Sequence, residues 1–207
     1  MKNMLKDAVI LFAITLIAGL VLGFVYQITK EPIALAEAKA EREAYMEVFP
    51  GAADFKQLSE GMPEDAAYLS DWNAAGYEGV SVEKVLSAVD ESGNALGYVL
   101  TLTSHEGYGG DITFSMGIRG DGTLNGISIL SISETPGLGM KAEEVLKPQF
   151  ADKQVAAFTY TKSGSTMDSE VDAISGATVT TKAVTSAVNG GLYYFQTQLG
   201  GGISEAK

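Results

Sequence analysis

The residues best suited to chemistry lie in one hydroxyl-rich stretch near the C-terminus, Asp172–Thr181. Within it, Gly176 and Ala177 separate a serine from a threonine. Apolar residues then recur at helical spacing as far as Leu199, which predicts a helix. The first turn of a helix has unpaired N–H groups, and the helix dipole favours negative charge there. The stretch therefore predicts a phosphate-binding turn at the start of a helix.

Two other loops are candidates for the walls of the same site. Gly107–Gly110 has three glycines in four positions, which allows close approach of backbone to a ligand, although a flexible connection explains it equally well. Glu134–Lys141 follows a predicted strand and precedes a predicted helix, 141–147. Such a junction suits an anionic or planar ligand, but a plain Pro-Gly turn has the same composition. The residues alone leave both alternatives open.

Strand patterns between these motifs predict the element that positions them. Residues 111–118 alternate between apolar and polar side chains, and tight turns separate this segment from its neighbours. Four such strands joined by turns predict an antiparallel sheet, and helices before and after it indicate an α+β domain. Residues 51–79 are weakly patterned and are predicted to form short helices and loops. The predicted strands are 81–89, 95–103, 111–118 and 123–133.

An uncharged apolar run, Ala8–Ile28, is long enough to cross a bilayer. A cleaved signal peptide is the alternative, but its apolar region is usually only about 7–15 residues, so an uncleaved anchor is favoured. Lys2 and Lys6 precede the run, which predicts a cytoplasmic N-terminus. We expect a single-pass protein of the cytoplasmic membrane: an anchor at 1–30, a helical stalk at 31–50 and an extracytoplasmic domain at 51–207.

Composition excludes several classes of chemistry. The chain has no cysteine, so it forms no disulfide, thiolate metal site or cysteine nucleophile. Its one histidine, His105, gives no basis for a histidine metal cluster, and we expect a hydrogen-bonded or exposed loop residue there. The net charge is −12, which disfavours nucleic acid as a partner. We expect no metal site and no catalytic residue, and a hydrolase is disfavoured because Ser175 has no nearby partner base in the sequence.

The order of these motifs resembles a known family. An N-terminal anchor, Gly-Tyr-Gly-Gly, Glu-Thr-Pro-Gly-Leu-Gly at 134–139, and Asp-x-x-Ser-Gly-Ala-Thr at 172–178 before a final helix are similar to the RnfG family, the G-type subunits of Rnf ion-translocating oxidoreductase complexes. The resemblance runs from residue 1 to about residue 199. The chain length favours this family over the related C-type subunit of the sodium-translocating NADH:quinone reductase, which is the alternative.

The resemblance implies a cofactor and a way of holding it. In this family FMN is covalently joined, through its phosphate, to the threonine that matches Thr178, and a flavin transferase recognises the motif that begins at Asp172. N–H groups at the start of the final helix are expected to contact the remaining phosphate oxygens. The supporting contacts implied are Ser175, Gly176, Ala177, Thr180 and Thr181 around the attachment point, with Glu134, Thr135, Gly137, Leu138, Gly139, Lys141 and Tyr108 from the two loops.

The family also implies a function. The protein would carry electrons on its FMN within a membrane complex that couples ferredoxin:NAD oxidoreduction to Na⁺ or H⁺ translocation. Its partners would be the other membrane, iron–sulfur and flavin subunits, the flavin transferase during maturation, and the lipid bilayer. A membrane-anchored flavin-binding sensor module and a purely structural assembly protein remain alternatives.

Overall fold

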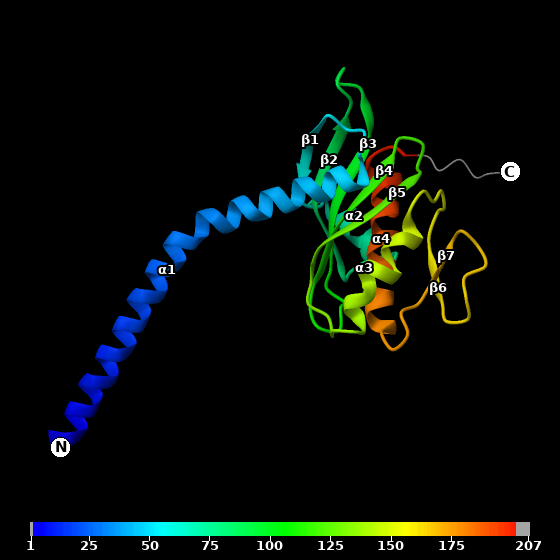
Figure 1. The fold of residues 1–207 in the computed structure, drawn as a ribbon. Coiled ribbons are helices and arrows are strands. Elements are labelled where there is room, and N and C mark those ends of the chain that lie inside the picture. The colour runs from blue at the N-terminus through cyan, green and yellow to red at the C-terminus, as the bar shows by residue number, and fades with distance from the viewer. Residues whose placement is uncertain (1, 202–207) are drawn as a thin grey trace. The chain divides into compact units, whose positions relative to one another are not determined.

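The computed structural model describes residues 2–201, with side chains from residue 4 onward (Figure 1). These residues divide into two compact units, one ending at Ala40 and the other beginning at Glu41. The first unit is the greater part of a single helix, α1 (Lys2–Val48), which continues through Pro32. Its apolar side chains between residues 9 and 28 are exposed, and the helix is long and apolar enough to cross a membrane.

The second unit is built on one antiparallel sheet with the strand order β1-β2-β3-β4-β5. The four strands predicted from alternation are present within one residue of their predicted ends, so the α+β fold class is confirmed. Tight turns join β2 to β3 and β4 to β5, as predicted. The strands are β1 (Asp54–Glu60), β2 (Val80–Val89), β3 (Ala95–Ser104), β4 (Ile112–Arg119) and β5 (Leu124–Ile132).

The prediction for residues 51–79 was wrong in one respect, because β1 lies there. This strand pairs with β2 at the edge of the sheet, from Asp54 opposite Val89 to Glu60 opposite Lys84. Most of its side chains are exposed, so its sequence lacks the apolar alternation of a half-buried strand. Backbone pairing, which sequence patterning does not report, holds it in place. The helix expected in this region is α2 (Ala66–Ala74), and it buries Tyr68 and Trp72.

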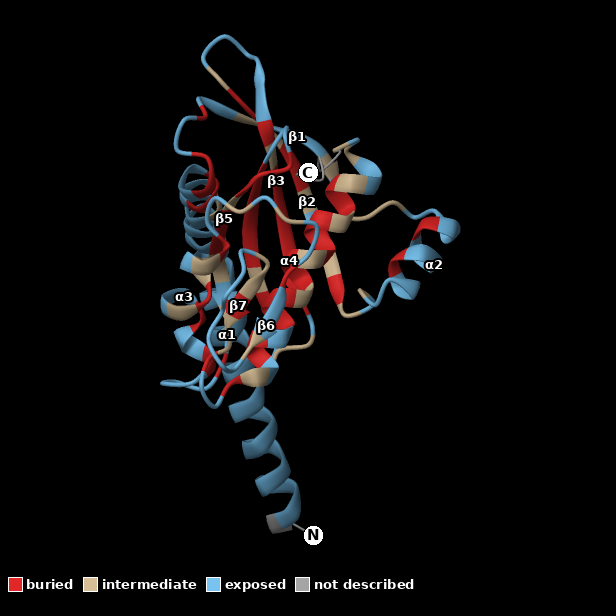
Figure 2. Ribbon diagram, turned by 90° about the vertical axis from the view of Figure 1, so that its right-hand side faces the viewer, coloured by how far each residue is buried: buried red, intermediate tan, exposed pale blue. Residues whose placement is uncertain are grey.

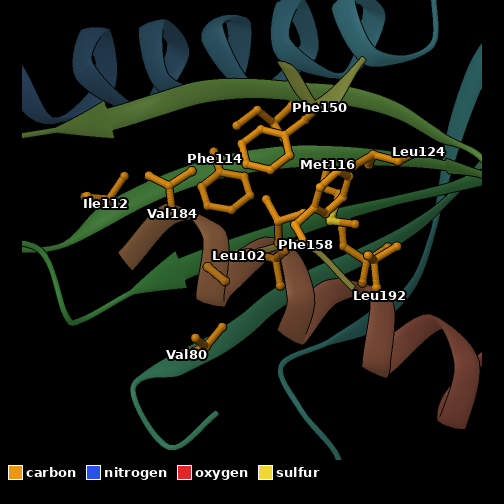
Figure 3. Close-up of a cluster of buried hydrophobic side chains, with 14 of the residues drawn as sticks. Val80, Leu102, Ile112, Phe114, Met116, Leu124, Phe150, Phe158, Val184 and Leu192 are labelled. Carbon is orange, nitrogen blue, oxygen red and sulfur yellow. The ribbon is translucent and has the colours of Figure 1, made fainter. Parts of the chain in front are cut away.

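One face of the sheet packs against the final helix, α4 (Thr178–Gln198) (Figures 2 and 3). The apolar side chains of β4 at positions 112, 114, 116 and 118 point into this layer and are fully buried. Complete burial of such a side chain contributes roughly 1.5–3 kcal/mol. Three short helices close the end of this layer: η1 (Gly139–Lys141), α3 (Ala142–Val145) and η2 (Lys147–Phe150). The buried residues at the centre include Leu102, Ile112, Phe114, Met116, Phe150, Val184 and Leu192.

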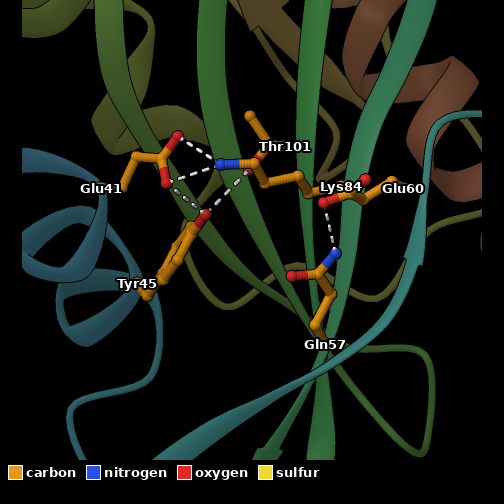
Figure 4. Close-up of polar contacts among 6 residues, drawn as sticks. All are labelled: Glu41, Tyr45, Gln57, Glu60, Lys84 and Thr101. Atoms are coloured by element: carbon orange, nitrogen blue, oxygen red, sulfur yellow. Dashed lines mark hydrogen bonds and ion pairs between the residues drawn. The ribbon is translucent and has the colours of Figure 1, made fainter. Parts of the chain in front are cut away.

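The opposite face of the sheet is covered by the last turns of α1. Tyr45, Val48 and Phe49 are buried there in a second apolar cluster with residues of β2 and β3. Beside it, both carboxylate oxygens of Glu41 accept hydrogen bonds of 2.8 Å from the Nζ of Lys84 (Figure 4). The folded unit therefore starts inside the segment expected to be a stalk, ahead of the boundary placed at residue 51.

A small parallel pair, β6 (Thr159–Thr161) and β7 (Glu170–Asp172), lies outside the main sheet. The pair ends at Asp172, and the Ala173 N–H that follows donates to the Thr161 carbonyl at 2.8 Å. This contact fixes the point at which the chain enters the hydroxyl-rich turn before α4.

Glu47, in the last turn of α1, has a lowered pKa that links the stability of the folded unit to pH. Burial alone would raise its pKa, but hydrogen bonds from Lys147, at 2.7 Å, and from Ser128 outweigh burial and hold the pKa below 4.5. A lowered pKa contributes stability that is complete above the unfolded-state pKa and is lost as the pH falls through the folded-state pKa.

We therefore expect Glu47→Gln to lower the free energy of unfolding at pH 7, and this deficit to shrink below about pH 4.5. Urea unfolding of wild type and variant across this range measures it. Lys147→Met is the matched control, because Glu47→Gln should have a smaller effect in that background. A deficit that stays constant from pH 7 to pH 3 would contradict the assignment.

Candidate functional site

Three segments that are far apart in the sequence enclose one pocket of about 520 Å³. This volume lies within the range of about 300–1,000 Å³ that is typical of small-molecule sites. The first segment contributes Tyr108, the second runs from Glu134 to Gly139, and the third is the start of α4 with the turn before it. The lining residues are Tyr108, Glu134, Thr135, Leu138, Gly139, Gly176, Ala177, Thr178, Val179 and Thr180.

The third wall is a tight turn followed by an uncapped helix. The Ala177 N–H donates to the Ile174 carbonyl at 3.0 Å, and Gly176 has φ +78°, a conformation that favours glycine. The N-cap residue of α4 is Ala177, whose side chain accepts no hydrogen bond. Because the first N–H groups of a helix have no partner within the helix, the start of α4 offers free donors at the pocket. The half-buried Thr178 and the buried Thr180 add hydroxyl groups.

Glu134, which lies in the second wall, holds the first wall against it. Its side chain is buried, and its Oε1 accepts hydrogen bonds from the backbone N–H groups of Tyr108, at 2.7 Å, and Gly109, at 3.3 Å. One carboxylate therefore holds the glycine-rich loop against the loop in which Glu134 itself lies. Tyr108 is 74% exposed, so its ring stands at the mouth of the pocket.

Glycine is required where the second and third walls meet. A Cβ added at Gly139 would lie 2.6 Å from the Oγ1 of Thr180 and 2.7 Å from the Oε2 of Glu134. At these distances the neighbouring side chains would have to shift, so glycine allows the loop to approach the first turn of α4 without displacing them. The pocket is lined by the threonines and free N–H groups at the start of α4 and by the side chains of Leu138, Tyr108 and Val179. These residues suit a ligand with a phosphate and a planar apolar part.

The pocket brings together most of the residues predicted from the sequence, but not all of them. Ser175 is exposed and does not line it, and Gly137 and Lys141 are exposed outside it. Thr181 is fully buried and bonded to the protein backbone. Val179 lines the pocket although it was not among the predicted contact residues; its position directly after Thr178 was the available signal.

Asp172 also lies outside the pocket lining. Its carboxylate accepts hydrogen bonds from the backbone N–H of Ser165, at 2.6 Å, and from the Ser165 hydroxyl, at 3.4 Å. Its own backbone N–H and carbonyl are both bonded to the side chain of Gln149. In the folded protein, this residue therefore fixes the loop between β6 and β7 ahead of the turn.

His105 is a hydrogen-bonded loop residue at the neck of the glycine-rich loop. Its ring nitrogens lie 3.0 Å from the hydroxyl of Ser81 and 3.0 Å from the carboxylate of Asp111. None of these three residues lines the pocket. The contact with Asp111 joins the two ends of the loop that carries Tyr108, and the contact with Ser81 ties this loop to β2, so His105 has a structural role.

Two protein-family models match this chain, and together they define its class of protein. The model of the FMN-binding domain matches residues 107–192, which include all three walls, and that of the RnfG N-terminal region matches residues 1–48. The chain is therefore an FMN-binding domain protein with an apolar N-terminal helix.

Relatives that match nearly the whole chain then define the family. The G-type subunit of the Na⁺-translocating ferredoxin:NAD⁺ oxidoreductase complex of Acetobacterium woodii is 33% identical over 94% of this chain and 93% of its own length. The G-type subunit of the ion-translocating oxidoreductase complex of Methanosarcina acetivorans is also 33% identical, over 96% and 98%. Its counterpart in the proton-translocating complex of Clostridium ljungdahlii is 32% identical, over 95% and 97%. The chain belongs to the RnfG family, the G-type subunits of ion-translocating oxidoreductase complexes.

Proposed function

We propose that this protein is an electron-transfer subunit of a membrane complex and that it carries FMN on the hydroxyl of Thr178. The complex would couple electron transfer between ferredoxin and NAD to the translocation of Na⁺ or H⁺, as the names of its relatives describe for those proteins. The observation that carries the proposal is the pocket itself, because a threonine hydroxyl lies in its wall at the uncapped start of α4.

The pocket residues fit the two parts of FMN. The N–H groups of the first turn of α4, with the hydroxyl of Thr180, would hold the phosphate oxygens. Leu138, Val179 and Tyr108 would border the ring and keep water from it. When bound, FMN supplies a ring that accepts and releases electrons, and the protein positions it and tunes its chemistry.

A flavin transferase is needed because a threonine hydroxyl is a weak nucleophile at neutral pH. In the proposed reaction, Oγ1 of Thr178 attacks the flavin-side phosphorus of a flavin dinucleotide. A P–O bond to Oγ1 forms, the pyrophosphate P–O bond breaks and a nucleoside monophosphate leaves. The hydroxyl proton passes to a base of the transferase, and no group is oxidised or reduced. The motif from Asp172 to Thr178 would be what the transferase recognises.

The membrane arrangement is also part of the proposal. The apolar part of α1 would anchor the protein in the cytoplasmic membrane by a single span, with Lys2 and Lys6 on the cytoplasmic side and the folded unit outside. Covalent attachment would then keep FMN from diffusing away on that side. The span 8–28 contains no charged residue, so the ion path would be formed by other subunits.

Mass spectrometry of the native protein tests the attachment. The protein is expressed in membranes with a flavin transferase, and a denaturing gel is examined for flavin fluorescence. Trypsin should release residues 163–182 as one peptide, which contains Ser175, Thr178, Thr180 and Thr181. We expect the mass of this peptide to increase by one flavin phosphoryl group and fragmentation to locate the group on Thr178. A dark band, or flavin on another residue, would refute the proposal.

A further inference from the structure

One buried hydroxyl closes the turn that precedes Thr178. The side chain of Thr181 is fully buried and makes two hydrogen bonds to that turn. Its Oγ1 donates to the Ala177 carbonyl at 2.9 Å and accepts from the Ile174 N–H at 3.1 Å. A single side chain in the first turns of α4 therefore ties both ends of the turn to the helix.

The Ala177 carbonyl also accepts a hydrogen bond from the Thr181 N–H at 3.0 Å, whereas the Ile174 N–H has no other hydrogen-bond partner among the described residues. Ile174 and Ala177, the two residues that Thr181 contacts, are buried. A buried N–H that loses its partner carries a large penalty, because water does not reach it. Removing the Thr181 hydroxyl should therefore release the start of the turn from the helix rather than exchange one partner for another.

The two hydroxyl-bearing residues on either side of Gly176 and Ala177 differ in their position relative to the pocket. Only Gly176 and Ala177 separate Ser175 from Thr178, yet Thr178 lines the pocket and Ser175 is exposed outside it. The Ala177 N–H donates to the Ile174 carbonyl and Gly176 has φ +78°, so the chain turns tightly between these two residues. A turn that is free to change conformation would no longer keep Thr178 in the pocket wall and Ser175 outside it.

The same helix provides an internal control. Thr185 lies four residues after Thr181 and is also buried, at 4% exposure. Within the described part of the chain, its Oγ1 has no hydrogen-bond partner. The two threonines thus differ chiefly in whether the hydroxyl is bonded to the turn.

We propose that Thr181 is a positioning residue for flavin attachment. Without touching the flavin, its hydroxyl fixes the 174–177 turn so that Thr178, and not Ser175, is presented for modification. This inference rests on the proposed function, because it concerns the reaction that loads Thr178.

The test compares three variants of the full-length chain: Thr181→Val, Thr181→Ser and Thr185→Val. Each is purified without flavin and mixed with the flavin transferase and a flavin dinucleotide, and the rate at which the 163–182 peptide gains flavin is measured. We expect Thr181→Val to be loaded at least about tenfold more slowly, with part of its flavin on Ser175. Thr181→Ser, which keeps the hydroxyl, and Thr185→Val should stay within about twofold of wild type.

Two rate outcomes would overturn the inference while the wild-type protein is loaded normally. In the first, Thr181→Val is loaded at the wild-type rate and only on Thr178. In the second, Thr185→Val is slowed as much as Thr181→Val, which would indicate a general effect on the helix. A wild-type protein that takes up no covalent flavin would refute the proposed function itself.

Hydrogen exchange of the wild-type protein keeps the inference testable if Thr181→Val does not fold. The Ile174 amide, which donates to Thr181, should exchange far more slowly than the amide of an exposed loop residue such as Gly164. Exchange of Ile174 at the rate of an exposed amide would show that Thr181 does not hold the turn.

Discussion

Thr178→Ala is expected to abolish covalent flavin completely. Alanine lacks the hydroxyl group that would form the phosphodiester bond, so no bond to this position is possible. The fold should survive, because Thr178 is the first residue of α4 and is only half-buried, and alanine has a higher helix propensity than threonine. In-gel flavin fluorescence after denaturation, set against protein stain and a thermal melt, measures loading and folding separately.

Two matched variants make this result specific. Thr178→Ser keeps a hydroxyl at the same position and should be loaded, whereas Ser175→Ala removes an exposed hydroxyl outside the pocket and should be loaded like wild type. Flavin that remains on Thr178→Ala after denaturation would place the attachment at another hydroxyl. Flavin that is bound by Thr178→Ala but released by denaturation would show that the pocket binds FMN without the covalent bond.

Sequence patterns predicted the sheet well because burial on one side leaves a clear signal. Residues 112, 114, 116 and 118 alternate with polar or small residues, and all four are fully buried beneath α4. The edge strand β1 has no such signal, because most of its side chains are exposed and only backbone bonds place it. The last turns of α1 were assigned to a stalk because only a few of their residues, such as Tyr45 and Val48, are buried against the sheet. So few apolar positions do not distinguish a packed helix from an exposed one in the sequence.

The site was predicted as a set of segments, but the role of each side chain was not. Helical periodicity sorts residues along the side of a helix, whereas this pocket lies at the end of α4, so it did not separate Thr180 from Thr181. The role of Glu134 depends on hydrogen bonds to Tyr108 and Gly109, which are more than twenty residues away in the chain. Such long-range bonds between a side chain and the backbone leave no local pattern in the sequence.

Gly139→Ala is expected to destabilise the protein and to slow flavin loading, because its new side chain crowds two walls of the pocket. Its new Cβ would lie 2.6 Å from the Thr180 hydroxyl and 2.7 Å from both the Cβ and the Oε2 of Glu134. Glu134 is not free to move away, because its other oxygen holds the Tyr108 loop. Crowding of this kind destabilises a protein by about 1–3 kcal/mol, and we also expect slower flavin loading because two walls of the pocket must shift.

The measurement is a thermal melt of the full-length protein in detergent together with the loading rate, and Gly120→Ala is the control. A Cβ at Gly120 meets nothing within 4 Å, so this variant should stay within about 0.5 kcal/mol of wild type. Wild-type stability in Gly139→Ala would mean that the loop relaxes away from α4. Loss of stability with an unchanged loading rate would separate the packing of this loop from the attachment reaction, because the pocket could then deform without affecting access to Thr178. A parallel loss of both would link the close approach of Gly139 to the presentation of that hydroxyl.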